Sequence, residues 1–171
     1  GLANAFYQPL IPDDWNTIEV HCIGDHIVSY MNGKKLAETH SRMSYKGAIG
    51  LQLHQGREPA HLRWKDIEIM KLPKAPRPFQ YMEEAAEQAP GEYRDLLAGK
   101  RIEDFDVHWG GADWSLQNGI LRGANPKDRA SWIFTKESYS DFILAFEYQI
   151  PKAGNAGVGV RFPWPAPGVD K

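Results

Sequence analysis

Cysteine, net charge and long apolar runs are all scarce in this chain. Of its 171 residues one is cysteine, Cys22, which excludes an internal disulfide framework and a zinc site built from thiolates alone. Lys and Arg number 20 and Asp and Glu 22, with no basic block, so nucleic acid is not expected as a partner. No apolar run approaches the ~20 residues that span a bilayer, so no membrane span is expected. Cys22 is predicted to be a small buried strand residue.

Motifs for nucleotide and serine-hydrolase chemistry are also missing. The sequence has no G-x-S-x-G elbow, no glycine-rich phosphate loop before a helix and no dinucleotide fingerprint. Its six histidines include no helical H-x-x-x-H or H-E-x-x-H pair, as in metalloproteases. The N-terminal stretch GLANAFYQPLIPDDW has neither a basic start nor an unbroken apolar segment, so it does not predict a signal peptide.

Glycine and proline separate short runs of β-branched and aromatic residues, which is typical of an all-β protein. Several runs alternate apolar and polar residues with period two, which predicts sheets with one buried face. Asn32-Gly33 and Asn118-Gly119 predict two-residue hairpin turns. The predicted strands are 16–22, 26–31, 48–53, 62–70, 114–116, 120–123, 131–135, 142–150 and 157–162.

The composition changes between the two β-rich segments, 1–72 and 92–171. Residues 73–79, PKAPRPF, read as a proline-rich extended linker, and 80–89 have the composition of a short helix ended by Pro90-Gly91. We expect the two segments to share sheets. Their predicted common core is Ile49, Leu51, Leu53, Phe142, Leu144, Phe146, Val158 and Val160.

Two strands have apolar residues on one face and, on the other face, polar residues interspersed with glycine. We call this second face the polar front. In GAIGLQLH the front carries Gly50, Gln52 and His54, and in NAGVGVRF it carries Asn155, Gly157, Gly159 and Arg161. Glycine inside a strand allows a ligand or another backbone to approach closely. One interpretation is a shallow cleft whose polar groups are Gln52, His54, Asn155 and Arg161, and the simpler alternative is a solvated sheet face.

A carboxylate and several tryptophans extend this candidate site. Glu147 lies among Ile and Ala on the second face of its strand and invites an arginine partner such as Arg161, unless it forms an ordinary structural ion pair. Trp109 and Trp164 lie in Gly- or Pro-rich loops and are predicted to contact ligand, since aromatic rings pack on the apolar faces of sugars. Trp15, Trp64 and Trp114 are expected in the core. His54 and His61 flank the loop QGREPA and could share a metal with a carboxylate.

Several motifs resemble one family. The runs DDWNTIEVHCIGDHIVSYMNGKKL, KGAIGLQLHQG and LRWKDIEIMKL look like the C-terminal half of the 3-keto-disaccharide hydrolase-like family, once a domain of unknown function. The runs LLAGKRIEDFDVHWGGADWSLQNGILRG, YSDFILAFEYQI and GNAGVGVRF look like its N-terminal half. The halves thus occur in reversed order, and an intervening family stretch that usually carries a Glu-x-Gln strand has no counterpart. We expect a piece cut across two tandem copies, with a permuted, shortened variant as the alternative.

The resemblance implies a fold and an activity. The fold is a concanavalin-like jelly roll of two antiparallel sheets with a concave ligand-binding face, in exported or periplasmic bacterial proteins. The activity is cleavage of 3-keto glycosides by elimination and hydration, with a divalent cation as a candidate electrophile. On the matching positions His54 would be a base or metal ligand, Arg161 an enolate or hydroxyl clamp, and Glu147 and Gln52 orienting groups.

Three expectations follow for function and assembly. The domain either cleaves glycosidic bonds of 3-keto sugars or binds carbohydrate without catalysis, because a fold does not fix function; a purely structural sandwich repeat is a third reading. If the polar fronts of GAIGLQLH and NAGVGVRF form one site, His54 and Arg161 should lie within about 10 Å of each other. One sugar ring could then contact both side chains. The missing stretch predicts that a second chain, a tandem copy or a swapped segment completes the sheet.

Overall fold

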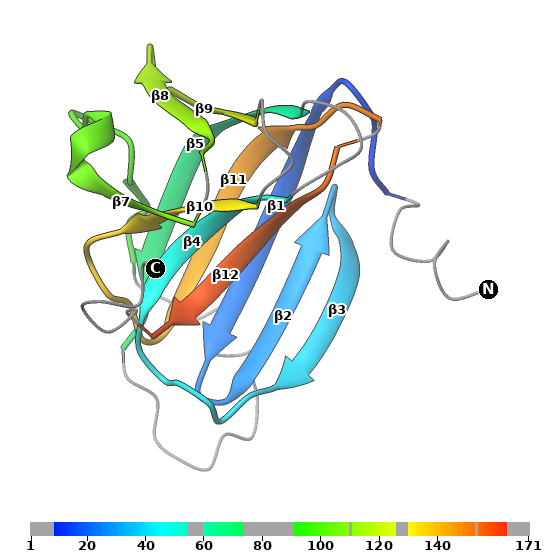
Figure 1. Cartoon of the computed structure of the whole chain (residues 1–171). Coiled ribbons are helices and arrows are strands. Elements are labelled where there is room, and N and C mark those ends of the chain that lie inside the picture. The colour runs from blue at the N-terminus through cyan, green and yellow to red at the C-terminus, as the bar shows by residue number, and fades with distance from the viewer. Residues whose placement is uncertain are drawn as a thin grey trace.

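The computed structural model describes residues 9–54, 60–73, 91–109, 111–125, 130–152 and 154–163. They form two antiparallel sheets packed face to face, the smaller one in front of the larger in Figure 1. The larger sheet holds β1 (Trp15–Ile23), β2 (His26–Met31), β3 (Lys34–His40), β5 (Ala60–Lys71), β6 (Arg94–Asp95), β8 (Asp113–Gln117), β9 (Ile120–Asn125) and β11 (Phe142–Gln149). The smaller sheet holds β4 (Ala48–Leu53), β7 (Phe105–His108), β10 (Ser131–Thr135) and β12 (Ala156–Phe162).

The strand order interleaves the two segments of the sequence. The larger sheet runs β3-β2-β1-β11-β5-β9-β8, with β6 paired to β5, and the smaller runs β12-β4-β10-β7. Each sheet therefore takes strands from both 1–72 and 92–171, which confirms that the segments share sheets. The all-β jelly-roll sandwich is also confirmed.

The helical content of the described residues is one 3-10 turn, Ile102–Asp104. The helix predicted at 80–89 lies outside the described residues. No helix in the described part of the chain is long and apolar enough to cross a membrane.

Both predicted hairpins are confirmed. Asn32 and Gly33 have φ angles of 49° and 74°, and Asn118 and Gly119 have 52° and 71°. Positive φ at both positions is what a two-residue turn between twisted antiparallel strands requires. The turns join β2 to β3 and β8 to β9, with Met31 opposite Lys34 and Gln117 opposite Ile120.

Strands β3, β6 and β7 were absent from the sequence prediction. Strand β3, KKLAETH, is exposed at almost every position and carries two lysines and a glutamate. It therefore lacks the alternation that marks a half-buried strand. It lies at the edge of the larger sheet, where lysine and glutamate discourage pairing with other chains. Strands β6 and β7 have two and four residues, too few to show a period.

The core lies between the sheets and contains most of the predicted residues. Ile49, Leu51, Leu53, Phe142, Leu144 and Phe146 are buried, whereas Val158 and Val160 on edge strand β12 are partly buried against them. Trp64 is buried, and the partly buried Trp114 stacks on it, with ring centroids 5.6 Å apart.

The prediction for Trp15 was wrong. Its ring lies on the outer face of the larger sheet beneath Lys65 and Arg63, because the next residue, Asn16, takes the buried position at the start of β1. Cys22 is buried as expected, and burial raises the pKa of its thiol to about 12 despite the nearby Arg161.

A buried arginine ties the two sheets together at one end. Arg161 of β12 is 2% exposed, and its Nη2 donates to Asp141 Oδ1 at 2.8 Å. Its Nε donates to the Ser140 carbonyl at 2.6 Å and its Nη1 to the Gly24 carbonyl. Asp141 Oδ1 also accepts from the Gly24 backbone N–H at 3.1 Å. These bonds join an edge strand of the smaller sheet to the β1–β2 turn and to the residues before β11.

The open edge of the smaller sheet bears on the expected partner. Among the described residues β12 is hydrogen-bonded to a single strand, β4, and Figure 1 shows β2 and β3 extending beyond β12. Completion of the sheet by a second chain, a tandem copy or a swapped segment stays a prediction.

The Arg161–Asp141 pair generates a stability prediction. Asp141→Asn or Arg161→Leu leaves one buried charge without its partner, so we expect the free energy of unfolding to fall by about 3–5 kcal/mol. Urea unfolding followed by tryptophan fluorescence measures this change. The matched control is Arg42→Leu, which removes the exposed pair with Asp25 at 3.2 Å and should cost below about 1 kcal/mol. Equal losses in the control and the core variants would contradict the structural role of Arg161.

Candidate functional site

The outer face of the smaller sheet carries a continuous group of aromatic rings. Trp132 and Phe134 of β10 stack with centroids 5.5 Å apart, and Phe162 of β12 lies 5.9 Å from Trp132 and 5.0 Å from Phe134. Trp109, just after β7, lies 6.2 Å from both Phe134 and Phe162. We call these four residues the aromatic face.

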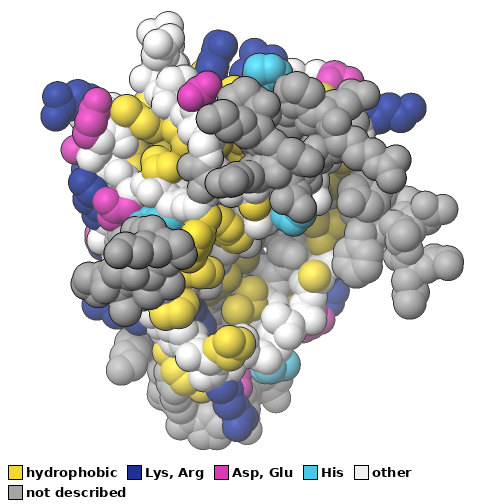
Figure 2. All heavy atoms as spheres, viewed as in Figure 1, with side chains coloured by type: hydrophobic (Ala, Val, Ile, Leu, Met, Phe, Trp, Pro, Cys, Tyr) yellow, Lys and Arg dark blue, Asp and Glu magenta, His cyan; other side chains and the backbone are white. Residues whose placement is uncertain are grey.

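The rings of the aromatic face differ in their exposure to solvent. Trp109 is 38% exposed, whereas Phe134 is fully buried beneath its neighbours. In the space-filling view, hydrophobic side chains gather near the centre of the side on which the smaller sheet lies (Figure 2). Positive φ at Trp109, 51°, turns the chain at the end of β7.

The strand glycines hold these rings close to the sheet. A Cβ atom on Gly50 would lie 2.4 Å from Phe134 Cε1, and one on Gly159 would lie 3.0 Å from Trp132 Cζ3. The polar front predicted for β4 and β12 is thus occupied largely by aromatic rings from β10. The glycines leave room for neighbouring side chains rather than for a ligand directly on the backbone.

A β-bulge removes Arg161 from this face, which corrects the sequence prediction. The register between β12 and β4 shifts between Gly159 and Phe162, and Arg161 has a φ of 52°. The extra residue breaks the alternation, so Arg161 points inward and Phe162 outward. Arg161 is therefore part of the buried network with Asp141, not a clamp on the outer face.

The antiparallel register of β4 and β12 contradicts the predicted proximity of His54 and Arg161. Phe162 lies opposite Ala48, whereas the His54 backbone N–H donates to the Asn155 carbonyl at 3.0 Å. The two residues thus lie at opposite ends of the β4–β12 pair. At about 3.4 Å per strand residue their backbones are about 20 Å apart.

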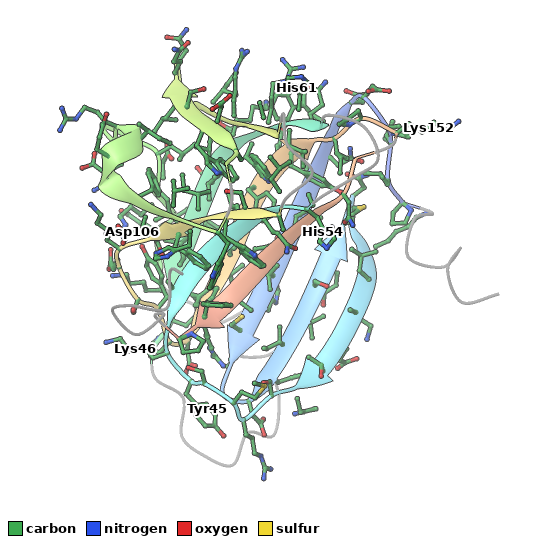
Figure 3. All side chains as sticks on the ribbon, in the orientation of Figure 1. Tyr45, Lys46, His54, His61, Asp106 and Lys152 are labelled. Carbon is green, nitrogen blue, oxygen red and sulfur yellow. The ribbon has the colours of Figure 1, made fainter. Side chains whose placement is uncertain are left out.

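Polar side chains border the aromatic face on two sides. On one side are Gln52 of β4 and, just past the strand end, His54 and Asn155. On the other side β7 carries Asp106 opposite Phe134 and His108 opposite Trp132. Figure 3 shows His54 and Asp106 on the two flanks of the smaller sheet, to either side of β10.

One row across the sheet brings these groups into register. Gln52 is opposite Trp132, and Trp132 is opposite His108, so the backbone of Trp132 lies between those of a glutamine and a histidine, while its ring extends over Gly50 and Gly159. Neighbouring strands are about 4.8 Å apart, which puts the Gln52 and His108 backbones about 10 Å apart. His108 packs against the aromatic face, with its ring 5.7 Å from those of Trp109 and Phe134. Aromatic rings bordered by hydrogen-bonding groups suit a ligand with an apolar face and polar edges, as a sugar has.

Glu147 lies on the opposite side of the sandwich, and its predicted pairing with Arg161 was wrong. It points from the outer face of the larger sheet and pairs with Lys65 at 3.0 Å. The hydrogen bond with Glu147 raises the pKa of the Lys65 ammonium. Glu147 is therefore apart from Gln52 and His54, with the core between them.

The remaining predicted site residues are placed as follows. Asn155 borders the aromatic face, Trp109 belongs to it, and Trp164 lies outside the described residues. His61 of β5 is well separated from His54 in Figure 3. Among the described residues, no three His, Cys, Asp or Glu side chains are grouped to hold a metal ion. The described residues therefore do not by themselves form a site for the divalent cation that the resemblance allows.

The sequence prediction missed three residues of the aromatic face, Trp132, Phe134 and Phe162, and two at its border, His108 and Asp106. The alternation of SWIFT does place Trp132 and Phe134 on one side and Ile133 on the other, so that signal was available. Strand β7 was not predicted, so nothing assigned a face to Asp106 or His108. The bulge that exposes Phe162 has no signature in the pattern.

These features define the chain as a jelly-roll β-sandwich with one aromatic outer face. A family model described as a 3-keto-alpha-glucoside-1,2-lyase-like domain matches residues 3–70 and 92–170. The chain belongs to this family, as its motifs predicted. No curated protein is similar enough to the chain to count as a match.

The contact of Gly50 with Phe134 generates a prediction. Gly50→Ala introduces a methyl group into the space of a fully buried ring, so we expect a loss of about 1–3 kcal/mol in the free energy of unfolding. Adding Phe134→Leu to Gly50→Ala should cost less than it does in the wild-type background. Urea unfolding of the two single variants and the double variant measures this coupling. Strictly additive losses would show that the ring and the glycine do not constrain each other.

Proposed function

We propose that this domain binds a 3-keto glycoside on the aromatic face and cleaves its glycosidic bond by elimination and hydration. Membership of the 3-keto-alpha-glucoside-1,2-lyase-like family supports the substrate class. The observation that carries the proposal is the row in which Trp132 lies between Gln52 and His108, with His54 beyond the end of β4. A sugar ring stacked on the indole has its hydroxyls directed toward these polar side chains.

The chemistry needs a base and a donor to a developing enolate. A ketone at C3 acidifies the hydrogen on C2, and in this proposal the His54 imidazole accepts that proton. The electron pair forms the enolate, and the C1–O bond then breaks as the glycosidic oxygen takes up a proton and leaves as an alcohol. Water adds across the C1–C2 double bond, so the net reaction is hydrolysis and no oxidant is consumed.

The other side chains have positioning roles in this proposal. The Gln52 amide and the His108 imidazole supply hydrogen-bond donors at the two ends of the row, one of them for the enolate oxygen. Asn155 binds a hydroxyl beside His54, and the half-exposed Trp109 covers the sugar from the β7 side. Trp164 is kept as a predicted ligand contact.

The second candidate is a carbohydrate-binding module without catalysis. It is favoured by the position of Glu147, since this carboxylate lies across the core from the aromatic face and pairs with Lys65. Aromatic rings that present flat faces suffice for sugar binding without any titrating group. Binding and turnover must therefore be measured separately.

The test compares cleavage of a 3-keto disaccharide with that of the unoxidised disaccharide, by release of reducing sugar. His54→Ala should lower kcat by about 10²–10⁴-fold with little change in KM, because a base acts chiefly in the transition state. Trp132→Ala should weaken binding about tenfold, equivalent to about 1.4 kcal/mol of stacking and apolar contact.

Matched controls are available on the opposite outer face. His21→Ala, at a histidine paired with Glu19, and Trp15→Ala, at an indole beneath Lys65, should leave turnover and binding unchanged. Binding by the intact protein without cleavage would favour the non-catalytic module. Unchanged kcat in the His54 variant would remove its assignment as the base.

A further inference from the structure

A hollow lies on the outer face of the larger sheet, on the opposite side of the sandwich from the aromatic face. It has a volume of about 660 Å³ and spans β5, β9 and β8, with Asp13 and Pro151 at its rim near β1 and β11. This volume is within the range typical of small-molecule sites. The row of side chains across its floor is Ser115, Arg122, Arg63 and Gln149, each opposite the next.

Two like charges occupy the middle of that row. Arg63 and Arg122 are directly opposite each other on β5 and β9, an arrangement that disfavours folding when nothing neutralises it. Within the described residues neither guanidinium has a carboxylate within 4.0 Å, although Asp13 and Asp113 line the same hollow. Arg63 lies 5.7 Å from the centre of the Trp15 ring, which also has the Lys65 ammonium above it at 4.8 Å.

The polar neighbours of the two arginines already form ion pairs or hydrogen bonds with other groups. Lys65 pairs with Glu147 and Asp66, and Gln149 donates from Nε2 to the Asp13 carbonyl at 2.8 Å. With these neighbours already paired, the two guanidinium groups lie at the centre of the hollow without a direct ion-pair partner among the described residues. Guanidinium forks match the geometry of carboxylate, sulfate and phosphate oxygens and bind them with charge-assisted hydrogen bonds.

We propose that Arg63 and Arg122 together bind one oxyanion group, a carboxylate, sulfate or phosphate, carried by a ligand up to the size of a small saccharide. The oxyanion neutralises the pair, and the Ser115 hydroxyl offers a further hydrogen bond at the β8 end. Asp13 and Asp113 line the same hollow and disfavour a second negative group, so a ligand with a single anionic group fits best. This site is independent of the proposed function, because it lies across the core from the aromatic face.

The test is calorimetric titration of the intact chain with glucuronate, glucose 6-phosphate and inorganic phosphate, with glucose as the neutral control. At least one anionic probe should bind with a stoichiometry of one, more weakly as salt rises, and glucose should not bind in this hollow. Arg63→Gln and Arg122→Gln should each weaken binding tenfold or more. Arg42→Gln, at an arginine already paired with Asp25, should leave it unchanged.

A second readout separates a binding role from a structural one. Without ligand, Arg122→Gln should leave the Tm unchanged or raise it, because it relieves the repulsion between the two arginines. The bound probe should raise the Tm of the wild-type chain and not that of the variant. A lower Tm of the unliganded variant, no binding of any anionic probe, or binding insensitive to both arginine variants would overturn the proposal. Cleavage of a 3-keto disaccharide by Arg122→Gln should equal that of the wild type, so failure of either proposal leaves the other intact.

Discussion

The β-bulge at Arg161 determines which side chains of β12 face the core and which face outward. Strict alternation through VGVRF would put Arg161 outside and Phe162 inside. With a φ of 52° and one extra residue, the strand instead turns the guanidinium toward Asp141 and the Gly24 carbonyl. The same irregularity puts Phe162 against Trp132 and Phe134. One backbone feature thus joins the two sheets and completes the aromatic face, and a change that removes it would affect stability and site together.

The two outer faces of the sandwich differ in chemistry because their strands differ in composition. The smaller sheet has glycines opposite aromatic residues, so rings from one strand cover the backbone of the next, and polar groups are left at the margins. The larger sheet has long charged side chains on its outer face, where Lys65 bridges Glu147 and Trp15 and where two arginines meet. An apolar face with polar edges suits a sugar ring, and a hollow in which two arginines lie side by side suits an oxyanion.

Local sequence patterns predicted much of the fold. They could not predict the features that depend on long-range strand pairing and register. Alternation in 48–53 and 142–150 identified β4 and β11 and their buried residues, and Asn-Gly pairs identified two hairpins. Glu147 was predicted to meet Arg161 because a carboxylate among Ile and Ala was expected to need an arginine partner. It lies instead on the outer face of β11 beside Lys65, while Arg161 points into the core from the other sheet. Trp15 was misassigned because the pattern at the start of a strand does not say which residue takes the first buried position. His108 was missed because β7 has four residues and no readable period.

The central claim is that ligand binds the aromatic face of the smaller sheet, and the indole N–H resonances of the tryptophans test it most directly. In a two-dimensional nitrogen–proton NMR spectrum, with signals assigned by Trp→Phe variants, a 3-keto disaccharide should shift the signals of Trp132 and Trp109. The signal of Trp64 in the core and that of Trp15 beneath Lys65 should stay in place. Shifts confined to Trp15, or no shift at Trp132 and Trp109 under conditions where the sugar is bound or cleaved, would contradict the account.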